Sequence, residues 1–141
     1  MSVIPARRRR KNEVSAVDEK VVVVQSFGFK YGMPTLSDYV LDVRVLTNPF
    51  YVDELKNLTG NDQKVVDYIM AQPQTAAFLE QMEGLIDCVV QEFSRKNRPQ
   101  IVISVGCTGG RHRSVFAANR IVEHLQKLGY RTEATHRDIN R

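Results

Sequence analysis

Ile101–Val115 has the sequence IVISVGCTGGRHRSV, which is the clearest indication of the fold in the chain. Its first five residues are apolar or small and rich in β-branched side chains, which is typical of a strand buried on both faces. A glycine-rich turn follows over Gly106–His112. Beyond it, apolar residues recur at helical spacing until Gly129, a residue type that commonly ends helices. The stretch therefore predicts a buried strand, a tight turn and a helix, the unit from which parallel α/β sheets are built.

The rest of the chain alternates between strand-like and helix-like patterns. Runs of β-branched or apolar residues predict further strands over 21–24, 39–45 and 131–135. Apolar residues at helical spacing predict helices over 63–71 and 74–95. Glycines and a proline predict a loop over 26–34. This order predicts an α/β fold, namely a three-layer domain with a mainly parallel sheet and an anion-binding strand–turn–helix at the sheet edge.

Basic residues are concentrated at the two ends of the chain. The sequence has 20 Lys and Arg residues against 16 Asp and Glu, a net charge of +4. Residues 1–11 hold five basic residues and no acidic one, whereas residues 111–141 hold seven basic and three acidic ones. Residues 1–19 also lack apolar periodicity, so we expect a disordered basic arm there and a domain over 20–141.

Composition excludes several classes of protein. No apolar run reaches the roughly 18 residues of a membrane span, and no apolar segment follows the arginine run, so neither a span nor a secretory signal is expected. No Walker A string occurs, which excludes P-loop ATP hydrolysis. The two cysteines, Cys88 and Cys107, lie in apolar segments without a metal-ligand spacing. We therefore expect reduced thiols, no metal and no cofactor in a cytoplasmic protein.

The turn before the last helix has the residues of an anion site. Gly109 and Gly110 can take positive φ and let a ligand approach the backbone. The first N–H groups of the helix favour an anion, Arg113 can fork two phosphate oxygens, and Thr108 and Ser114 supply hydroxyls. A plain strand-to-helix connection, with glycines for tight packing, is the alternative. We predict a phosphate or carboxylate site at the carboxyl ends of the strands.

Cys107 and Arg113 are spaced as in the C-x5-R-[ST] loop of cysteine phosphatases, in which a thiolate attacks phosphorus. Gly106 stands where those enzymes have His, and no Asp is an evident general acid. Cys107 is therefore expected to be a small buried residue. A phosphatase, or another phosphoryl-handling enzyme that uses Cys107, is the alternative function.

Four further side chains are candidates for contact with the ligand. Lys30 and Tyr31 follow the first strand and are expected to point at the same sheet edge. Arg44 shares a strand face with Asp42, with which it can pair, and lies close enough to the strand end to meet the anion. His136 follows the last predicted strand and is the fourth candidate for contact with the ligand. The simpler interpretation is that it belongs to a solvated C-terminal tail.

These segments together resemble the C-terminal domain of the RapZ family, the RNase adapter and nucleotide-binding proteins of bacteria. The resemblance spans residues 21–139 and is carried by Ser26–Gly32 (SFGFKYG), Asp42–Pro49 (DVRVLTNP), Thr59–Asp62 (TGND), Gly106–Ser114 (GCTGGRHRS) and Thr135–Asp138 (THRD). Full-length members also have an N-terminal P-loop kinase-like domain, to which no part of this chain corresponds.

The resemblance implies a fold likened to part of phosphofructokinase, binding of small RNAs and glucosamine-6-phosphate, and assembly into oligomers. The sugar-phosphate site would comprise Thr108, Gly109, Gly110, His112 and Arg113, with Tyr31 facing them where some members have His. We therefore predict a non-enzymatic regulatory module that binds a phosphorylated small molecule resembling an amino-sugar phosphate. RNA, bound by the basic ends, and a second copy of the chain are the predicted partners, and a membrane is not.

Overall fold

All four strands of the sheet are parallel, in the order β2-β3-β1-β4. The computed structural model describes residues 20–141, so the predicted basic arm over 1–19 lies outside the described residues. The strands are β1 (Val21–Gly28), β2 (Tyr39–Asp42), β3 (Gln100–Cys107) and β4 (Thr132–His136). The helices are α2 (Gln63–Met70), α3 (Thr75–Arg95) and α4 (Arg113–Lys127), with 3-10 turns η3 (Phe29–Tyr31) and η4 (Pro49–Tyr51).

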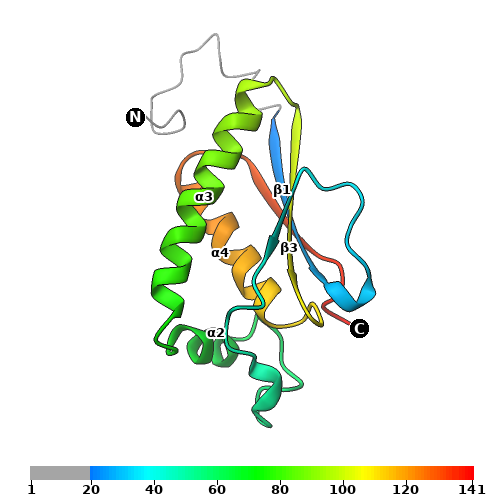
Figure 1. The fold of residues 1–141 in the computed structure, drawn as a ribbon, viewed down its shortest axis with the longest axis vertical. Helices are drawn as coiled ribbons and strands as arrows, with labels where there is room; N and C mark the ends of the chain where they lie inside the picture. The colour runs from blue at the N-terminus through cyan, green and yellow to red at the C-terminus, as the bar shows by residue number, and fades with distance from the viewer. Residues whose placement is uncertain (1–19) are drawn as a thin grey trace.

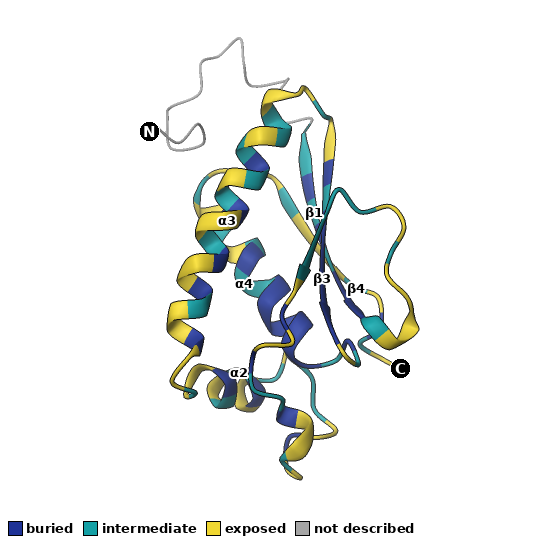
Figure 2. Ribbon diagram, in the orientation of Figure 1, coloured by how far each residue is buried: buried dark blue, intermediate teal, exposed yellow. Residues whose placement is uncertain are grey.

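The helices form because each buries apolar residues at helical spacing, and these residues join those of the strands in one core. In α3 the buried residues recur at helical spacing, at Leu79, Met82, Ile86 and Val90. Helix α4 packs against β1, β3 and β4, and its first six residues are all buried. Figure 2 shows the buried sides of α3 and α4 turned toward one another and toward the sheet. The core therefore lies between these helices and one sheet face.

The two sides of the sheet are covered differently. In Figure 1, α3 and α4 lie on one side and the segment that leads from η3 to β2 lies on the other. The predicted α/β class and parallel sheet are confirmed, and the architecture is consistent with three layers, one of them this irregular segment. Within the described residues, no helix has both the length and the apolar character of a membrane span.

Two predicted strand ends are wrong by three or four residues, while the bounds of β3 and β4 differ from the predicted ones by one or two. β1 continues to Gly28, because residues 25–28 stay in register with residues 104–107 of β3, so the loop predicted from residue 26 begins later. β2 ends at Asp42 instead of residue 45, because the chain turns where the Leu46 N–H donates to Val43 O. Arg44 therefore lies in a turn. Cys88 is exposed on α3, since helical periodicity carries it away from the apolar stripe.

The strand order places a binding crevice between β1 and β3. The segment after β1 and the helix after β3 leave neighbouring strands on opposite sides of the sheet (Figure 1). At such a switch point the two connections part and leave a hollow beyond the carboxyl ends of the strands. The residues that follow β1 and β3 include Lys30, Tyr31 and the turn Thr108–His112. The fold therefore brings two of the candidate segments together.

Candidate functional site

The turn after β3 is fixed by close contact with the end of β1. Gly110 has a φ of +79°, in the left-handed region that favours glycine. A Cβ at this position would lie 2.6 Å from the Gly28 nitrogen and 2.9 Å from the Asp138 Cβ. Two backbone bonds also tie the turn, from Gly60 N–H to Arg111 O (2.8 Å) and from Lys30 N–H to Thr108 O (3.2 Å).

The turn presents unused backbone donors ahead of a long helix. Among residues 20–141, the N–H groups of Gly109, Arg111 and His112 donate no hydrogen bond. Helix α4 begins at the next residue, Arg113, so its positive dipole end adds to these donors. Free N–H groups at a helix N-terminus form a ready anion site.

Arg113 is a buried guanidinium with a donor left over. The residue is 6% exposed, and its Nη1 donates to Arg44 O (2.8 Å) and Leu46 O (3.1 Å). Its Nε is buried without a partner among the described residues. An unsatisfied buried donor costs about 1–3 kcal/mol, more when charged, so such atoms are uncommon in folded proteins.

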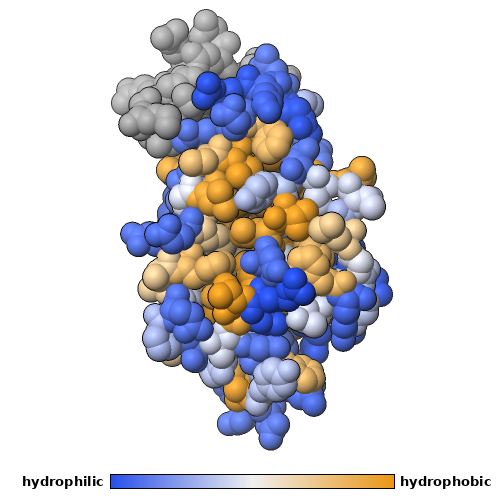
Figure 3. All heavy atoms as spheres, in the orientation of Figure 1, coloured by the Kyte–Doolittle hydropathy of each residue, from blue (hydrophilic) through white to orange (hydrophobic). Residues whose placement is uncertain are grey.

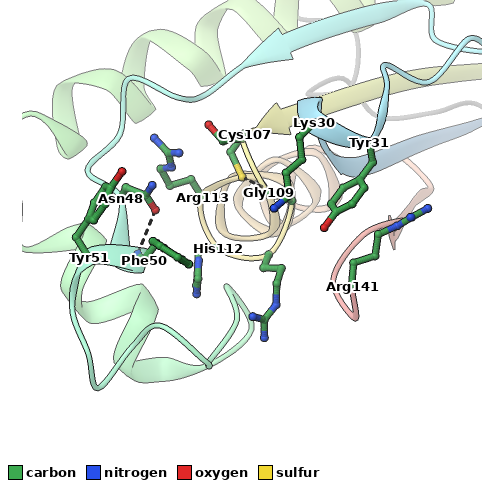
Figure 4. A pocket seen from close by; sticks show the side chains of 13 residues that line it. Lys30, Tyr31, Asn48, Phe50, Tyr51, Cys107, Gly109, His112, Arg113 and Arg141 are labelled. Carbon is green, nitrogen blue, oxygen red and sulfur yellow. Dashed lines mark hydrogen bonds between the residues drawn. The ribbon is translucent and has the colours of Figure 1, made fainter.

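Cys107 lies at the base of the turn and is buried, as predicted. Its Sγ–H donates to the Ser114 Oγ at 3.2 Å, and the Gly110 N–H donates to the Sγ at 3.3 Å. Ser114 itself is fully buried beneath the sulfur. Figure 4 shows the sulfur directed into the ring formed by the turn, beside Gly109.

These groups surround a cavity of about 370 Å³. Its lining is strongly cationic: four of the side chains are Lys or Arg, and no carboxylate of the described residues is among them. Tyr31 lies between two of the cations, with Lys30 Nζ 5.2 Å and Arg141 Cζ 4.5 Å from its ring centre (Figure 4). The lining residues are Lys30, Tyr31, Asn48, Phe50, Tyr51, Cys107, Thr108, Gly109, Gly110, Arg111, His112, Arg113 and Arg141.

Asp138 fixes the C-terminal wall of this cavity. Its fully buried carboxylate accepts from Gly28 N–H (2.7 Å) and Arg141 Nε (2.8 Å), and it pairs with Arg137 at 2.8 Å. Burial acts to raise its pKa, but the hydrogen bonds from Arg137 and Gly28 and the nearby arginine charges outweigh burial, so the pKa of Asp138 lies below its usual value. The carboxylate therefore holds Arg141 beside the ligand space.

His112 lies in the cavity wall as a largely buried ring. Its Nε2 is 3.2 Å from Leu55 O. Burial lowers the pKa of His112, an effect only partly offset by hydrogen bonds to backbone carbonyls. The neutral ring therefore donates from Nε2 to Leu55, and this contact fixes the ring beside the turn.

Three predicted site residues do not line the cavity. Ser114 lies beneath Cys107, and Arg44 forms a two-point ion pair with Asp42 whose shortest distance is 2.7 Å. The Arg44 hydrogen bond lowers the pKa of Asp42. His136 is bonded through Nδ1 to Ser26 Oγ (2.7 Å) and through Nε2 to an Asn119 oxygen (3.1 Å). It joins β4 to β1 and α4 and does not line this cavity.

Five lining residues were not predicted: Asn48, Phe50, Tyr51, Arg111 and Arg141. The first three belong to η4 and its cap, where the Asn48 side chain accepts from Phe50 N–H. An Asn-Pro pair signals such a turn, but only the tertiary fold shows that it reaches the sheet edge. Arg141 carries no local signal, because its position depends on the buried Asp138.

The departure from cysteine phosphatases at Gly106 has a steric cause. A Cβ there would lie 2.5 Å from Phe27 Cζ and 2.6 Å from Phe29 Cε2, so aromatic rings fill the space that a His side chain would need. Nor do the described residues offer a metal site, since no cluster of three or more His, Cys, Asp or Glu side chains has suitable geometry.

Comparison with known proteins agrees with this geometry. A family model described as the RapZ C-terminal domain matches residues 20–140. Similar proteins include nucleotide-binding proteins of Clostridium botulinum (strain Eklund 17B / Type B), 48% identical over 118 residues, and of Clostridium kluyveri, 49% identical over 119. In each case 84% of this chain is matched, and it spans only about 40% of the relative's length. The chain belongs to the RapZ C-terminal domain family.

Proposed function

We propose that this domain is a regulatory module that binds a phosphorylated small molecule without turning it over. The observation that carries the proposal is the set of unbonded N–H groups of Gly109, Arg111 and His112, beside Arg113, which lines the same cavity. These donors lie at the N-terminal end of helix α4 next to a guanidinium, an arrangement that suits a phosphate group. The relatives' name, nucleotide-binding protein, also supports a phosphorylated ligand.

The rest of the cavity suits a compact polar group such as an amino sugar. At about 370 Å³ it has room beyond a single phosphate. Asn48, Thr108 and Tyr31 can exchange hydrogen bonds with sugar hydroxyls, and Phe50 with Tyr51 supplies flat apolar surface. The family resemblance makes glucosamine-6-phosphate the first ligand to test. Binding is favoured over Cys107-dependent hydrolysis because the described lining contains no Asp or Glu that could act as the general acid.

Calorimetric titration with glucosamine-6-phosphate, glucosamine and inorganic phosphate tests the proposal. Glucosamine-6-phosphate should bind, and glucosamine without its phosphate should not. Arg113→Ala should remove a charge-assisted interaction of about 1.5–3 kcal/mol, about one to two powers of ten in affinity. Arg95→Ala is the matched control, because Arg95 is exposed on α3 away from the cavity. Equal affinity of the parent and Arg113→Ala would refute the proposed site.

RNA remains a proposed second partner. Arg111 and Arg141 line the cavity, and Arg137 shares the carboxylate of Asp138 with Arg141, while the basic run Arg7–Lys11 lies outside the described residues. Their contacts with RNA would be mainly electrostatic, so the affinity should fall with salt at a log–log slope of about −0.7 per neutralised phosphate on single strands. Filter binding of a structured RNA with and without residues 1–11 measures this slope. The absence of binding at low salt would refute this part.

A homo-oligomer is also proposed, as the family resemblance implies. Met33 and Leu36 are exposed on the segment before β2, at 56% and 85%. Figure 3 shows apolar side chains gathered at the surface over the middle of the molecule. Apolar surface of this kind supports association between copies. Light scattering at several protein concentrations would show a monomer throughout if this proposal is wrong.

A further inference from the structure

We propose that the ligand carries a second phosphate group, apart from the one bound at the turn, and that Lys30 and Arg141 bind it. The inference rests on the proposed function and narrows its ligand to small molecules with two separate phosphates, such as sugar bisphosphates. Tyr31, whose ring lies between these two cations, belongs to the same place. We call Lys30, Tyr31 and Arg141 the second subsite.

The cavity lining has more positive charge than one phosphate can neutralise. Three of its four cations form no ion pair with a described carboxylate, namely Lys30, Arg111 and Arg113. Both of these arginines bond to backbone carbonyls, which satisfy hydrogen bonds but carry no net charge. The fourth cation, Arg141, shares the carboxylate of Asp138 with Arg137. A phosphate monoester carries a charge of about −1.5 to −2 at pH 7, so one bound phosphate would leave the cavity positive.

The strand order separates these cations into two sets. Arg113 is fixed by carbonyls of the turn after β2, at one edge of the sheet. Arg141 is fixed by Asp138, which follows β4 at the other edge. Neighbouring strands lie about 4.8 Å apart, so the backbone segments that hold the two arginines are separated by three such spacings. A phosphate at the turn after β3 would therefore leave the cations beyond β1 and β4 for another group.

Contacts within the fold hold the second subsite together. Lys30 Nζ lies 5.2 Å and Arg141 Cζ 4.5 Å from the centre of the Tyr31 ring. Arg137 Nη2 donates to Gly32 O at 2.7 Å, which ties the end of η3 to the C-terminal segment. Figure 4 shows the side chains of the second subsite together on one side of the turn. Two cations beside one ring repel each other, and an anion that contacts both offsets that repulsion.

Arg141 is oriented by the fold with its outer nitrogens free. Its Nε donates to the buried Asp138 carboxylate at 2.8 Å. Within residues 20–141 its two terminal nitrogens donate no hydrogen bond, so they can contact two oxygens of one phosphate. The Lys30 amine and the Tyr31 hydroxyl also form no hydrogen bond in this part of the chain. The second subsite can therefore donate to a phosphate without breaking a hydrogen bond of the fold.

Calorimetric titration of the full chain with glucosamine-6-phosphate and glucosamine-1,6-bisphosphate tests the inference, because the two ligands differ only in one phosphate. The bisphosphate should bind about ten- to a hundred-fold more tightly, the gain expected of one charge-assisted interaction. In the double variant Lys30→Met/Arg141→Gln the ratio of the two affinities should fall toward one. The control Arg95→Gln/Lys96→Met removes the same charges from the exposed end of α3 and should keep the full ratio. A ratio that the first double variant leaves unchanged would overturn the assignment of the second subsite.

Inorganic phosphate and pyrophosphate form a second pair of probes. The two phosphates of pyrophosphate share one oxygen, so they cannot reach two separate sets of cations. Pyrophosphate should therefore gain less over inorganic phosphate than the bisphosphate gains over glucosamine-6-phosphate. An equal gain would indicate a site for adjoining phosphates and would overturn the separate subsite.

Amide NMR signals of the parent locate the second phosphate without any variant. Both sugar phosphates should shift the signals of Gly109 and Arg111, and the bisphosphate should add shifts at Tyr31 and Arg141. If both ligands bind equally tightly and no shifts are added, the second subsite is wrong and the proposed function stands. If neither ligand nor inorganic phosphate binds, the proposed function and this inference fail together.

Discussion

Replacing Asp138 by Ala should destabilise the domain well beyond an ordinary surface substitution. The Gly28 N–H would lose its acceptor in a fully buried position, which costs about 1–3 kcal/mol. Arg137 and Arg141 would lose their partner as well, but their side chains are 28% and 53% exposed and can return to water. Their share is therefore small, and we expect a total loss of about 2–3 kcal/mol in the free energy of unfolding.

Urea denaturation at neutral and acid pH measures this loss. Because the pKa of Asp138 is lowered in the fold, its carboxylate stabilises the protein above its unfolded value of 3.8, and this contribution disappears as pH falls through the folded value. The parent and Asp138→Ala should therefore differ at pH 7 and converge in strong acid. Asp53→Ala, at an exposed position, is the control and should have no effect. A loss below about 0.5 kcal/mol, the range of surface substitutions, would refute the reasoning.

Two more predictions concern stability. Burial lowers the pKa of His112 and of His136 below 6.5, so the unfolded chain takes up protons first, and the free energy of unfolding should fall as pH drops below that value. Denaturation at pH 7 and at pH 5.5 measures this loss of stability. His136→Gln should reduce the difference between the free energies of unfolding at the two pH values. Equal free energies of unfolding at both pH values in the parent would contradict the prediction. Gly110→Ala should cost more than about 1 kcal/mol, because its φ is +79° and the Gly28 nitrogen lies 2.6 Å from the added Cβ. Gly84→Ala, on α3 with no atom within 4 Å of the added Cβ, should instead stabilise by about 0.5–1 kcal/mol, and equal effects at the two glycines would refute the strain argument.

The sequence allowed the parallel α/β fold to be predicted because its elements are local patterns. β-branched runs and helical spacing depend on neighbours in the chain, and so does the strand–turn–helix around Gly106–His112. Strand ends were predicted less well. β1 reaches Gly28 because β3 continues beside it. This is a tertiary effect, and the local sequence around Phe27 and Gly28 does not indicate it.

The far walls of the cavity depend on contacts between distant residues. Arg141 reaches the cavity through Asp138, which is bonded to Gly28 at a separation of 110 residues. His136 looked like a ligand residue from its place after a strand, yet it is bonded to Ser26 and Asn119. Strand order determines which groups a polar side chain at a sheet edge can bond to. Local sequence patterns do not determine strand order, so these partners could not be predicted.

We propose that the turn after β3 binds phosphate through its free backbone donors. An NMR titration with inorganic phosphate is the sharpest test, since the amide signals report each N–H separately. Saturable shifts are expected at Gly109, Arg111 and His112, with Gly84 on α3 and Gly129 after α4 unchanged. Signals at the turn that stay in place at saturating phosphate, or shifts confined to other parts of the domain, would contradict it.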